Sequence, residues 1–161
     1  MSKILRWSIK PYLLVSIISL LLVGVAVAQN LYLCTRAVDG DTIVVNIEGK
    51  HENVRLIGVD TPETVHPFKP VEYYGKEASE FTKSMVEGKQ VRLEYDWQKR
   101  DKYGRLLAYV FLTDGTFINA EIVKQGYGHA YTRFPFKYLE EFRRYEREAR
   151  ENNRGLWKED K

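Results

Sequence analysis

The chain has 161 residues, 25 of them basic and 22 acidic, which gives a formal net charge of +3. This length indicates one domain that can bury a core, and its single cysteine excludes an internal disulfide framework. Because three of the basic residues and none of the acidic ones precede Gln29, the rest of the chain is formally neutral. Bulk charge therefore does not indicate nucleic-acid binding, and any affinity for a polyanion must come from local patches.

The N-terminal segment has the pattern of a secretory signal peptide. The first ten residues contain three basic side chains and no acidic one, those of Lys3, Arg6 and Lys10. Residues 12–28 are uncharged and end in Ala-Val-Ala, a small-x-small cleavage pattern. We expect residues 1–28 to be cleaved, and residues 29–161 to form a secreted or periplasmic domain. The alternative is an uncleaved membrane anchor, although the apolar run is shorter than the roughly 20 residues of a spanning helix.

Five later segments have the composition or alternation of β-strands. They are 31–38, 42–48, 53–59, 90–97 and 106–112. The fourth alternates most cleanly, and its apolar residues predict one buried face formed by Val91, Leu93, Tyr95 and Trp97.

Three segments have helical spacing. The first follows Gly75 and ends at Gly88, and the second is short, with Asn119 as its predicted N-cap and Gly126 as its end. The third runs from about residue 138 to residue 153. Its charges of both signs recur at i, i+3 and i+4, which is more typical of a solvated, ion-paired helix face than of a nucleic-acid-binding surface.

The order of these segments is three strands, a helix, two strands and two helices. This order predicts an α+β protein, a five-stranded β-barrel of the OB-fold type with three helices. Such barrels bind oligonucleotides across one face, but a fold alone does not establish a function.

Four carboxylates lie close to the ends of predicted strands. They are Asp39, Asp41, Asp60 and Glu63. The pair Asp39 and Asp41, or the pair Asp60 and Glu63, is by itself typical of an ordinary turn. If the fold brings both pairs together, the four negative charges repel one another unless a cation intervenes. Arg55 and Arg105 supply part of that charge and leave the group at −2. Oxygen-only ligands favour a hard ion such as calcium over zinc.

Five motifs in matching order give the chain a resemblance to the staphylococcal nuclease, or thermonuclease, family. The similarity extends from about residue 37 to residue 157. The motifs are Val38–Thr42, Val54–Leu56, Val59–Thr64, Tyr74–Ala78 and Asp101–Tyr109. The resemblance implies that Asp41 and Asp60 bind calcium through their carboxylates and Thr61 through its carbonyl, while Asp39 acts from the outer shell.

The resemblance also implies roles in the reaction. Glu63 would activate the attacking water, and Arg55 and Arg105 would hold the phosphate. The substrates would be DNA and RNA, cleaved to leave 3′-phosphates. Calcium would be the cofactor.

The substrate-binding residues follow the family pattern less closely. Lys102, Tyr103 and Tyr131 match positions beside the nucleotide, although Tyr131 is as compatible with a core position. Arg133 stands where a second tyrosine is usual, and the loop at residues 66–70 departs from the lysine-rich form. Nothing in the sequence indicates an obligate partner, so we expect a monomer.

Two other functions are compatible with parts of the sequence. One is a non-catalytic OB-fold module that binds nucleic acid, which would not need the full set of acids and arginines. The other is an exported adhesion or envelope-interaction module with a structural calcium site, which leaves Arg55 and Arg105 unexplained. Retention of both arginines together with Asp41, Asp60 and Glu63 favours the nuclease.

Overall fold

A computed structural model describes residues 30–64 and 72–158 of the chain. The predicted signal peptide and the loop at residues 66–70 lie outside the described residues. None of the helices in the described ranges is long and apolar enough to cross a membrane.

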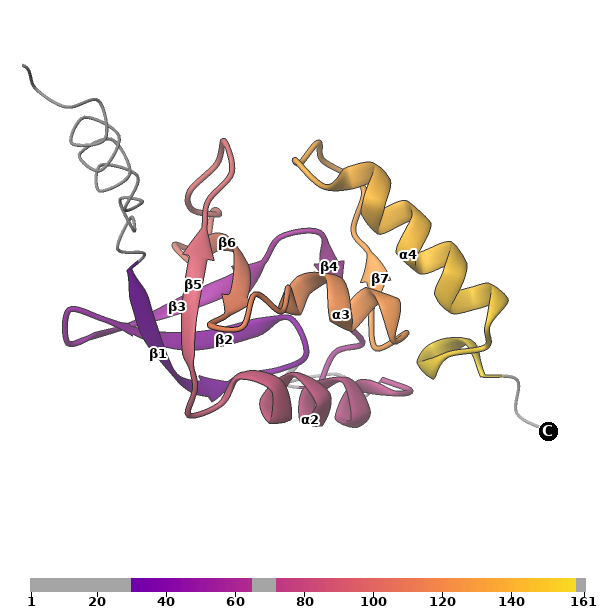
Figure 1. The fold of residues 1–161 in the computed structure, drawn as a ribbon, viewed down its shortest axis with the longest axis horizontal. Coiled ribbons are helices and arrows are strands. Elements are labelled where there is room, and N and C mark those ends of the chain that lie inside the picture. Colours follow the sequence, from indigo (N-terminus) through magenta and orange to yellow (C-terminus); the bar gives the residue numbers. More distant parts are fainter. Residues whose placement is uncertain (1–29, 65–71, 159–161) are drawn as a thin grey trace, which may run out of the picture.

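Five strands close into a barrel (Figure 1). They are β1 (Leu31–Ala37), β2 (Thr42–Ile47), β3 (Lys50–Leu56), β5 (Gln90–Glu94) and β6 (Leu106–Leu112). The strand order is β1-β2-β3-β6-β5, and β5 pairs with β1 to complete the closure. Only the β3–β6 pairing of this barrel is parallel; the other pairs are antiparallel. The predicted five-stranded OB-fold barrel is confirmed.

The predicted strand at residues 53–59 is divided in two. Strand β3 starts earlier, at Lys50, because its first half pairs with β2 in a hairpin. The chain then turns at Gly58, whose φ of 77° favours glycine. A separate two-residue strand, β4 (Val59–Asp60), pairs with β7 (His129–Ala130) outside the barrel.

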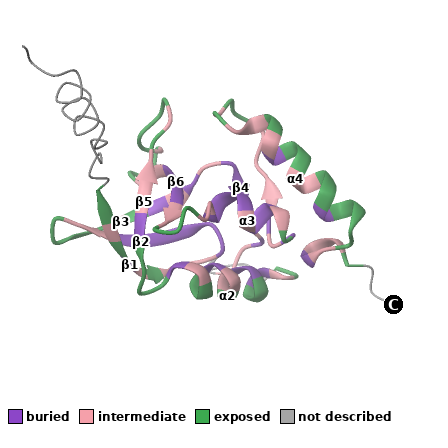
Figure 2. Cartoon of the chain, viewed as in Figure 1, coloured by how far each residue is buried: buried purple, intermediate pink, exposed green. Residues whose placement is uncertain are grey.

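Three α-helices complete the fold, as predicted. They are α2 (Gly75–Val86), α3 (Ile118–Lys124) and α4 (Leu139–Glu151), and a short 3-10 helix, η1 (Gly155–Trp157), follows. Helix α3 packs against both β6 and α4. Figure 2 shows buried residues along the barrel strands and α3, and mostly exposed residues along α4. The ion pair between Arg150 and Glu146 on α4 agrees with the predicted solvated face.

The prediction that Asn119 caps α3 is wrong. Helix α3 begins at Ile118, and Asn119 is fully buried inside it. Its side-chain oxygen accepts a hydrogen bond from the Val110 backbone N–H (2.9 Å), and its amide donates to the carbonyls of Ile57 (2.9 Å) and Ala108 (3.1 Å). Asn119 therefore joins α3 to the barrel by satisfying buried backbone groups.

Trp97 does not continue the buried face of β5, as its spacing predicted. The strand ends at Glu94, so Tyr95 and Trp97 both lie beyond it and are 36% and 68% exposed. The chain leaves the sheet at Asp96, whose carboxylate accepts hydrogen bonds from the Tyr109 hydroxyl and the Lys137 backbone N–H. A buried hydroxyl and a loop amide thus fix the chain where a regular strand would have continued.

The core is one cluster of aliphatic and aromatic side chains inside the barrel and under α3 and α4. Its largest members include Ile43, Val45, Val54, Leu56, Val91, Val110, Ile118, Ile122 and Phe142. Cys34 is buried in the same cluster, as expected from its apolar neighbours. Burial raises the pKa of its thiol to about 11, which keeps the thiol protonated and unreactive at neutral pH.

Candidate active site

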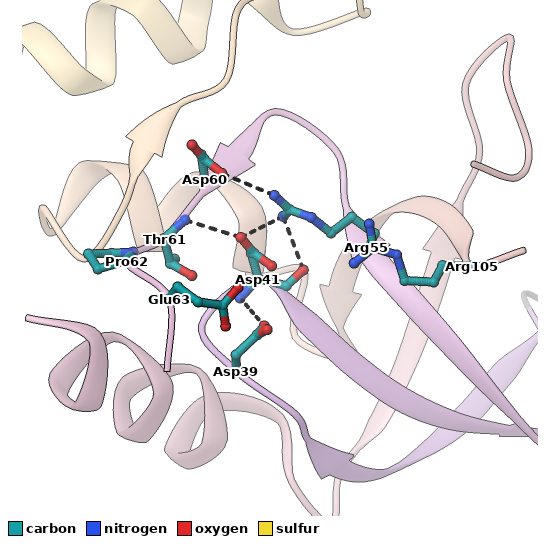
Figure 3. Close-up of a pocket in the computed structure, with 8 residues that line it drawn as sticks. All are labelled: Asp39, Asp41, Arg55, Asp60, Thr61, Pro62, Glu63 and Arg105. Atoms are coloured by element: carbon teal, nitrogen blue, oxygen red, sulfur yellow. Dashed lines mark hydrogen bonds and ion pairs between the residues drawn. The ribbon is translucent and has the colours of Figure 1, made fainter. Parts of the chain in front are cut away.

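The predicted carboxylates and arginines come together in one pocket at the end of the barrel (Figure 3). Residues from the β1–β2 turn, from β3, from β4 and the segment after it, and from the position just before β6 contribute to it. The pocket has a volume of about 210 Å³. It is lined by Asp39, Asp41, Arg55, Asp60, Thr61, Pro62, Glu63 and Arg105.

Gly40 lets the two acidic turns pack against each other. A Cβ atom at this position would lie 2.7 Å from the side chain of Thr61, closer than real Cβ contacts allow. On the other side of the contact, the Thr61 backbone N–H donates to Asp41 Oδ2 at 3.1 Å. The absence of a side chain at Gly40 therefore sets the spacing between the β1–β2 turn and the segment after β4.

Asp41 is the most constrained acid of the site. It is only 6% exposed, and its Oδ1 accepts a hydrogen bond from the Thr42 hydroxyl at 3.0 Å. Its Oδ2 forms an ion pair with Arg55 Nη1 at 2.7 Å. Burying a carboxylate this deeply is costly unless hydrogen bonds and an opposite charge compensate for the lost solvation.

Arg55 links three parts of the pocket. Besides its pair with Asp41, Nη1 donates to the Val59 carbonyl at 2.8 Å, and Nη2 lies 3.3 Å from Asp60 Oδ1. Its side chain is 17% exposed, whereas that of Asp60 is 53% exposed. The Asp41 pair is thus the buried contact, and the Asp60 pair is the solvent-screened one.

Asp39 is a partly buried carboxyl beside the charge of Asp41. Burial raises the pKa of this carboxyl to about 6, and the charge of Asp41 adds to the effect. The backbone N–H of Asp41, which donates to Asp39 Oδ1 at 3.1 Å, opposes the shift. A cation in the pocket would favour the ionised form of Asp39.

Asp101 binds Arg105 at its Nε and at its backbone N–H, and the rest of the guanidinium is directed into the pocket. Its Nε pairs with Asp101 Oδ2 at 2.8 Å, and its backbone N–H donates to the other oxygen of that carboxylate at 3.0 Å. These contacts hold the pKa of Asp101 below its usual range, despite the opposing effect of burial. Figure 3 shows the Arg105 side chain directed towards that of Arg55, on the other side of the pocket from Asp39 and Glu63.

Glu63 is fixed through its backbone by a residue that the sequence did not reveal. Its N–H donates to Glu72 Oε2 at 3.1 Å, and its carbonyl accepts from the Glu72 N–H at 3.0 Å. Figure 3 shows the Glu63 carboxylate pointing into the pocket on the side of Asp39 and Asp41. No pattern in the sequence identifies Glu72 as the partner, because the two residues are nine positions apart.

The oxygen atoms around the pocket match the preference of a hard cation. Candidate ligands are the carboxylates of Asp41 and Asp60 and the backbone carbonyl of Thr61, with Asp39 nearby. Within residues 30–64 and 72–158, no three His, Cys, Asp or Glu side chains are grouped closely enough to form an ion site by themselves. Arg55 lies between Asp41 and Asp60 and carries the positive charge there.

The three predicted substrate-binding residues lie outside the pocket lining. Lys102 and Tyr103 share the β5–β6 loop with Arg105, whose guanidinium lies 5.5 Å from the Tyr103 ring centroid. Tyr103 is 72% exposed. Tyr131 directly follows β7 and is half-buried, with Arg133 lying 5.9 Å from its ring centroid.

Known proteins resemble this chain over most of its length. A family model described as "Staphylococcal nuclease homologue" matches residues 53–159. The thermonuclease of Staphylococcus hyicus is 46% identical over 130 residues, which are 80% of this chain and 76% of that protein. The thermonuclease of Staphylococcus intermedius is 48% identical over 127 residues, 78% of this chain and 75% of that protein. The chain belongs to the staphylococcal nuclease family.

A third relative carries a nuclease name as well. Endonuclease YncB of Bacillus subtilis is 44% identical over 125 residues, 76% of this chain but 59% of that protein. The chain is therefore a nuclease, a hydrolase with a nucleic-acid substrate. The resemblance found in the sequence motifs is confirmed. The match to the family model includes Arg55 and Arg105, whereas Asp39 and Asp41 precede it.

The packing of Gly40 against Thr61 leads to a prediction for this staphylococcal nuclease homologue. Gly40→Ala should push the acidic turns apart and reduce the rate of DNA hydrolysis roughly 10- to 100-fold, because small displacements of catalytic groups are costly. Initial rates and urea unfolding curves test this.

Gly49→Ala is the matched control. Gly49 has a φ of 83° but no atom within 4 Å of an added Cβ, so its substitution should cost about 1 kcal/mol of stability without reducing the rate. An unchanged rate in Gly40→Ala would contradict the proposed spacing role.

Proposed function

We propose that the protein is a calcium-dependent nuclease that hydrolyses phosphodiester bonds in DNA and RNA and leaves 3′-phosphates. The observation that supports this most is the composition of the pocket. Four carboxylates and two guanidinium groups line one cavity, a combination suited to a cation and a phosphodiester together.

The donor set of the pocket fits calcium. Asp41 and Asp60 would hold the ion through carboxylate oxygens and Thr61 through its backbone carbonyl, with Asp39 acting from the outer shell. Burial, and to a lesser degree the charge of Asp41, raises the pKa of Asp39, and a bound cation would offset both effects by favouring its ionised form. When bound, calcium would polarise a phosphoryl oxygen and help to position water.

Glu63 is the proposed general base. Its carboxylate faces the pocket, while the paired hydrogen bonds with Glu72 fix its backbone. A general base must lie within hydrogen-bond reach of the water that it deprotonates, and a fixed backbone restricts the positions that its side chain can take. Glu63 would therefore accept the proton of the water that attacks phosphorus.

Arg55 and Arg105 are the proposed phosphate ligands. A planar guanidinium can donate two parallel hydrogen bonds to phosphate oxygens and stabilise the charge that develops on them. Arg105 is well suited to this, since Asp101 binds its Nε and its tip faces the pocket. Lys102, Tyr103 and Tyr131 would contact the flanking nucleotides, which gives little sequence specificity when phosphate contacts dominate.

The N-terminal segment supports a proposal about location. Its basic start, uncharged run and Ala-Val-Ala ending suit export by a cleaved signal peptide, and thus a secreted or periplasmic nuclease. An uncleaved segment would instead tether the nuclease to the membrane. We further propose that the nuclease acts as a monomer, because all the groups assigned to the reaction come from one chain.

The metal and the bond cleaved can be tested together. The protein is incubated with single-stranded and duplex DNA in calcium, in magnesium or with a chelator, and the product ends are mapped. We expect 3′-phosphate ends in calcium, slower cleavage in magnesium because of its stricter octahedral geometry, and none with the chelator. Equal rates in both metals would contradict the calcium assignment, and intact DNA with folded protein would favour a non-catalytic binding module.

The role of Glu63 predicts the effect of removing its basicity. Glu63→Gln should lower kcat roughly 100- to 10,000-fold, because the amide cannot accept the proton. Glu77→Gln, at an exposed position on α2, is the control and should keep the wild-type rate. Near-normal turnover by Glu63→Gln, with an unchanged unfolding midpoint, would remove Glu63 as the base.

The role of Arg105 predicts that lysine cannot replace it. Arg105→Lys keeps the positive charge but loses the planar guanidinium that can donate two parallel hydrogen bonds, so kcat should fall roughly 100-fold or more. Arg143→Lys, which changes an exposed ion pair with Glu140 on α4, is the control and should retain activity. Full activity of Arg105→Lys would argue against phosphate binding by that guanidinium.

A further inference from the structure

Four aromatic side chains outside the pocket are mostly exposed to solvent in the described residues, and two of them, Trp97 and Phe134, have no role in the proposed function. Trp97 in the β5–β6 loop is 68% exposed, and Phe134 in the segment before α4 is 61% exposed. Neither position was assigned a function from the sequence. Exposed rings of this size often mark an interaction surface.

The two loops that carry these rings are fastened to each other. The Trp97 indole N–H donates to the Pro135 carbonyl at 3.0 Å, next to Phe134. The Lys137 ammonium pairs with Glu94 at 2.6 Å, and its backbone N–H bonds Asp96 at 2.9 Å. Figure 1 shows both loops extending on the same side of the molecule. The rings therefore form part of one surface with a fixed framework.

Both loops are connected to the active site through the chain and its backbone pairing. Asp60 lines the pocket, and its backbone lies opposite that of His129 in the antiparallel pairing of β4 with β7. Tyr131 follows this ladder, and its N–H donates to the Gly58 carbonyl at 2.9 Å. Three residues further on, the chain reaches Phe134, whose ring centroid lies 6.1 Å from that of Tyr131. At the other end, the loop of Trp97 continues to Arg105, which lines the pocket.

The two loops also concentrate positive charge in a chain that is otherwise nearly balanced. Residues 95–105 and 131–137 contain two acidic residues, Asp96 and Asp101, and six basic ones. The basic residues are Lys99, Arg100, Lys102, Arg105, Arg133 and Lys137. All of them except Arg100 lie over tyrosine rings, at distances of 4.8 Å for Lys137 to 5.9 Å for Arg133. Interleaved cations and rings suit a polyanion that carries flat bases.

We propose that Trp97 and Phe134 form a base-stacking subsite that binds unpaired nucleotides beyond the phosphodiester being cleaved. The subsite deepens the proposed nuclease function and rests on it. Single-stranded nucleic acid can place its bases on exposed rings, while the neighbouring cations contact its phosphates. Duplex bases are already stacked on one another, so the rings give no comparable gain with a duplex.

Binding is tested separately from cleavage, in full-length protein that carries Glu63→Gln and keeps the substrate intact. Phe134→Leu and Trp97→Leu, singly and together, remove the rings but leave apolar side chains. The double substitution should raise the Kd for a labelled single strand of about 12 nucleotides at least tenfold, and leave the Kd for a duplex of the same sequence within about twofold. Leu33→Ala, an exposed apolar position on β1, should change neither.

Trp97→Phe separates stacking from the tether between the loops. It keeps a ring but loses the indole N–H that bonds the Pro135 carbonyl, so single-strand affinity should be largely retained. In the active enzyme, the ring-free double variant should raise KM for the 12-nucleotide strand but not for a dinucleotide that spans only the scissile bond. Loss of dinucleotide cleavage would instead show damage to the active site.

Several outcomes would overturn the subsite. Unchanged single-strand affinity in the double variant would do so, as would equal losses for single strand and duplex. Ring-dependent binding to anionic phospholipid vesicles, with oligonucleotide binding unaffected, would assign the surface to membranes instead. Because the binding assay uses protein with Glu63→Gln, it reports on the subsite even if the proposed cleavage chemistry fails.

Discussion

The ion pair between Asp41 and Arg55 is the contact around which the active end of the barrel is organised. It joins the start of β2 to the end of β3, and the same carboxylate accepts the backbone N–H of Thr61. Each charge would be costly to bury alone, so each requires the other. Once this pair forms, the turn that contains Asp39 and the segment that contains Asp60 are drawn to the same place.

Barrel topology makes the pair possible and adds the second arginine. In the antiparallel β2–β3 hairpin, Thr42 pairs with Arg55, which places the neighbouring Asp41 beside the guanidinium. Strand β6 then runs parallel to β3, with Leu106 opposite Val54. Arg105 immediately precedes that register position and therefore enters the pocket on the side of Arg55. Closure of the sheet thus converts three distant sequence motifs into one cavity.

The sequence was informative where local rules decide the structure. Alternation and helical spacing predicted the five barrel strands and three helices, and the acidic motifs predicted which side chains share the pocket. The errors arose where tertiary contacts override local preference. The position of Asn119 in the sequence is typical of a helix N-cap, but its side-chain amide instead donates hydrogen bonds to buried backbone carbonyls of the barrel. Trp97 has strand spacing, but the contacts of Asp96 turn the chain out of the sheet. Glu72 supports Glu63 through hydrogen bonds that no spacing rule reveals.

The two arginines of the pocket are not equivalent, and the difference matters for interpreting the site. Arg55 donates to Asp41 and to the Val59 carbonyl, and it also lies near Asp60. Most of its hydrogen-bond donors are therefore already used in contacts that hold the pocket together. Its removal would leave a buried carboxylate unpaired, and stability and catalysis would fall together. Arg105 is bound to Asp101 at Nε, at the base of its guanidinium, and is 31% exposed at the side chain. Substitutions at Arg105 that keep a donor for Asp101 therefore test the proposed phosphate binding more directly, whereas substitutions at Arg55 measure the architecture of the pocket as well.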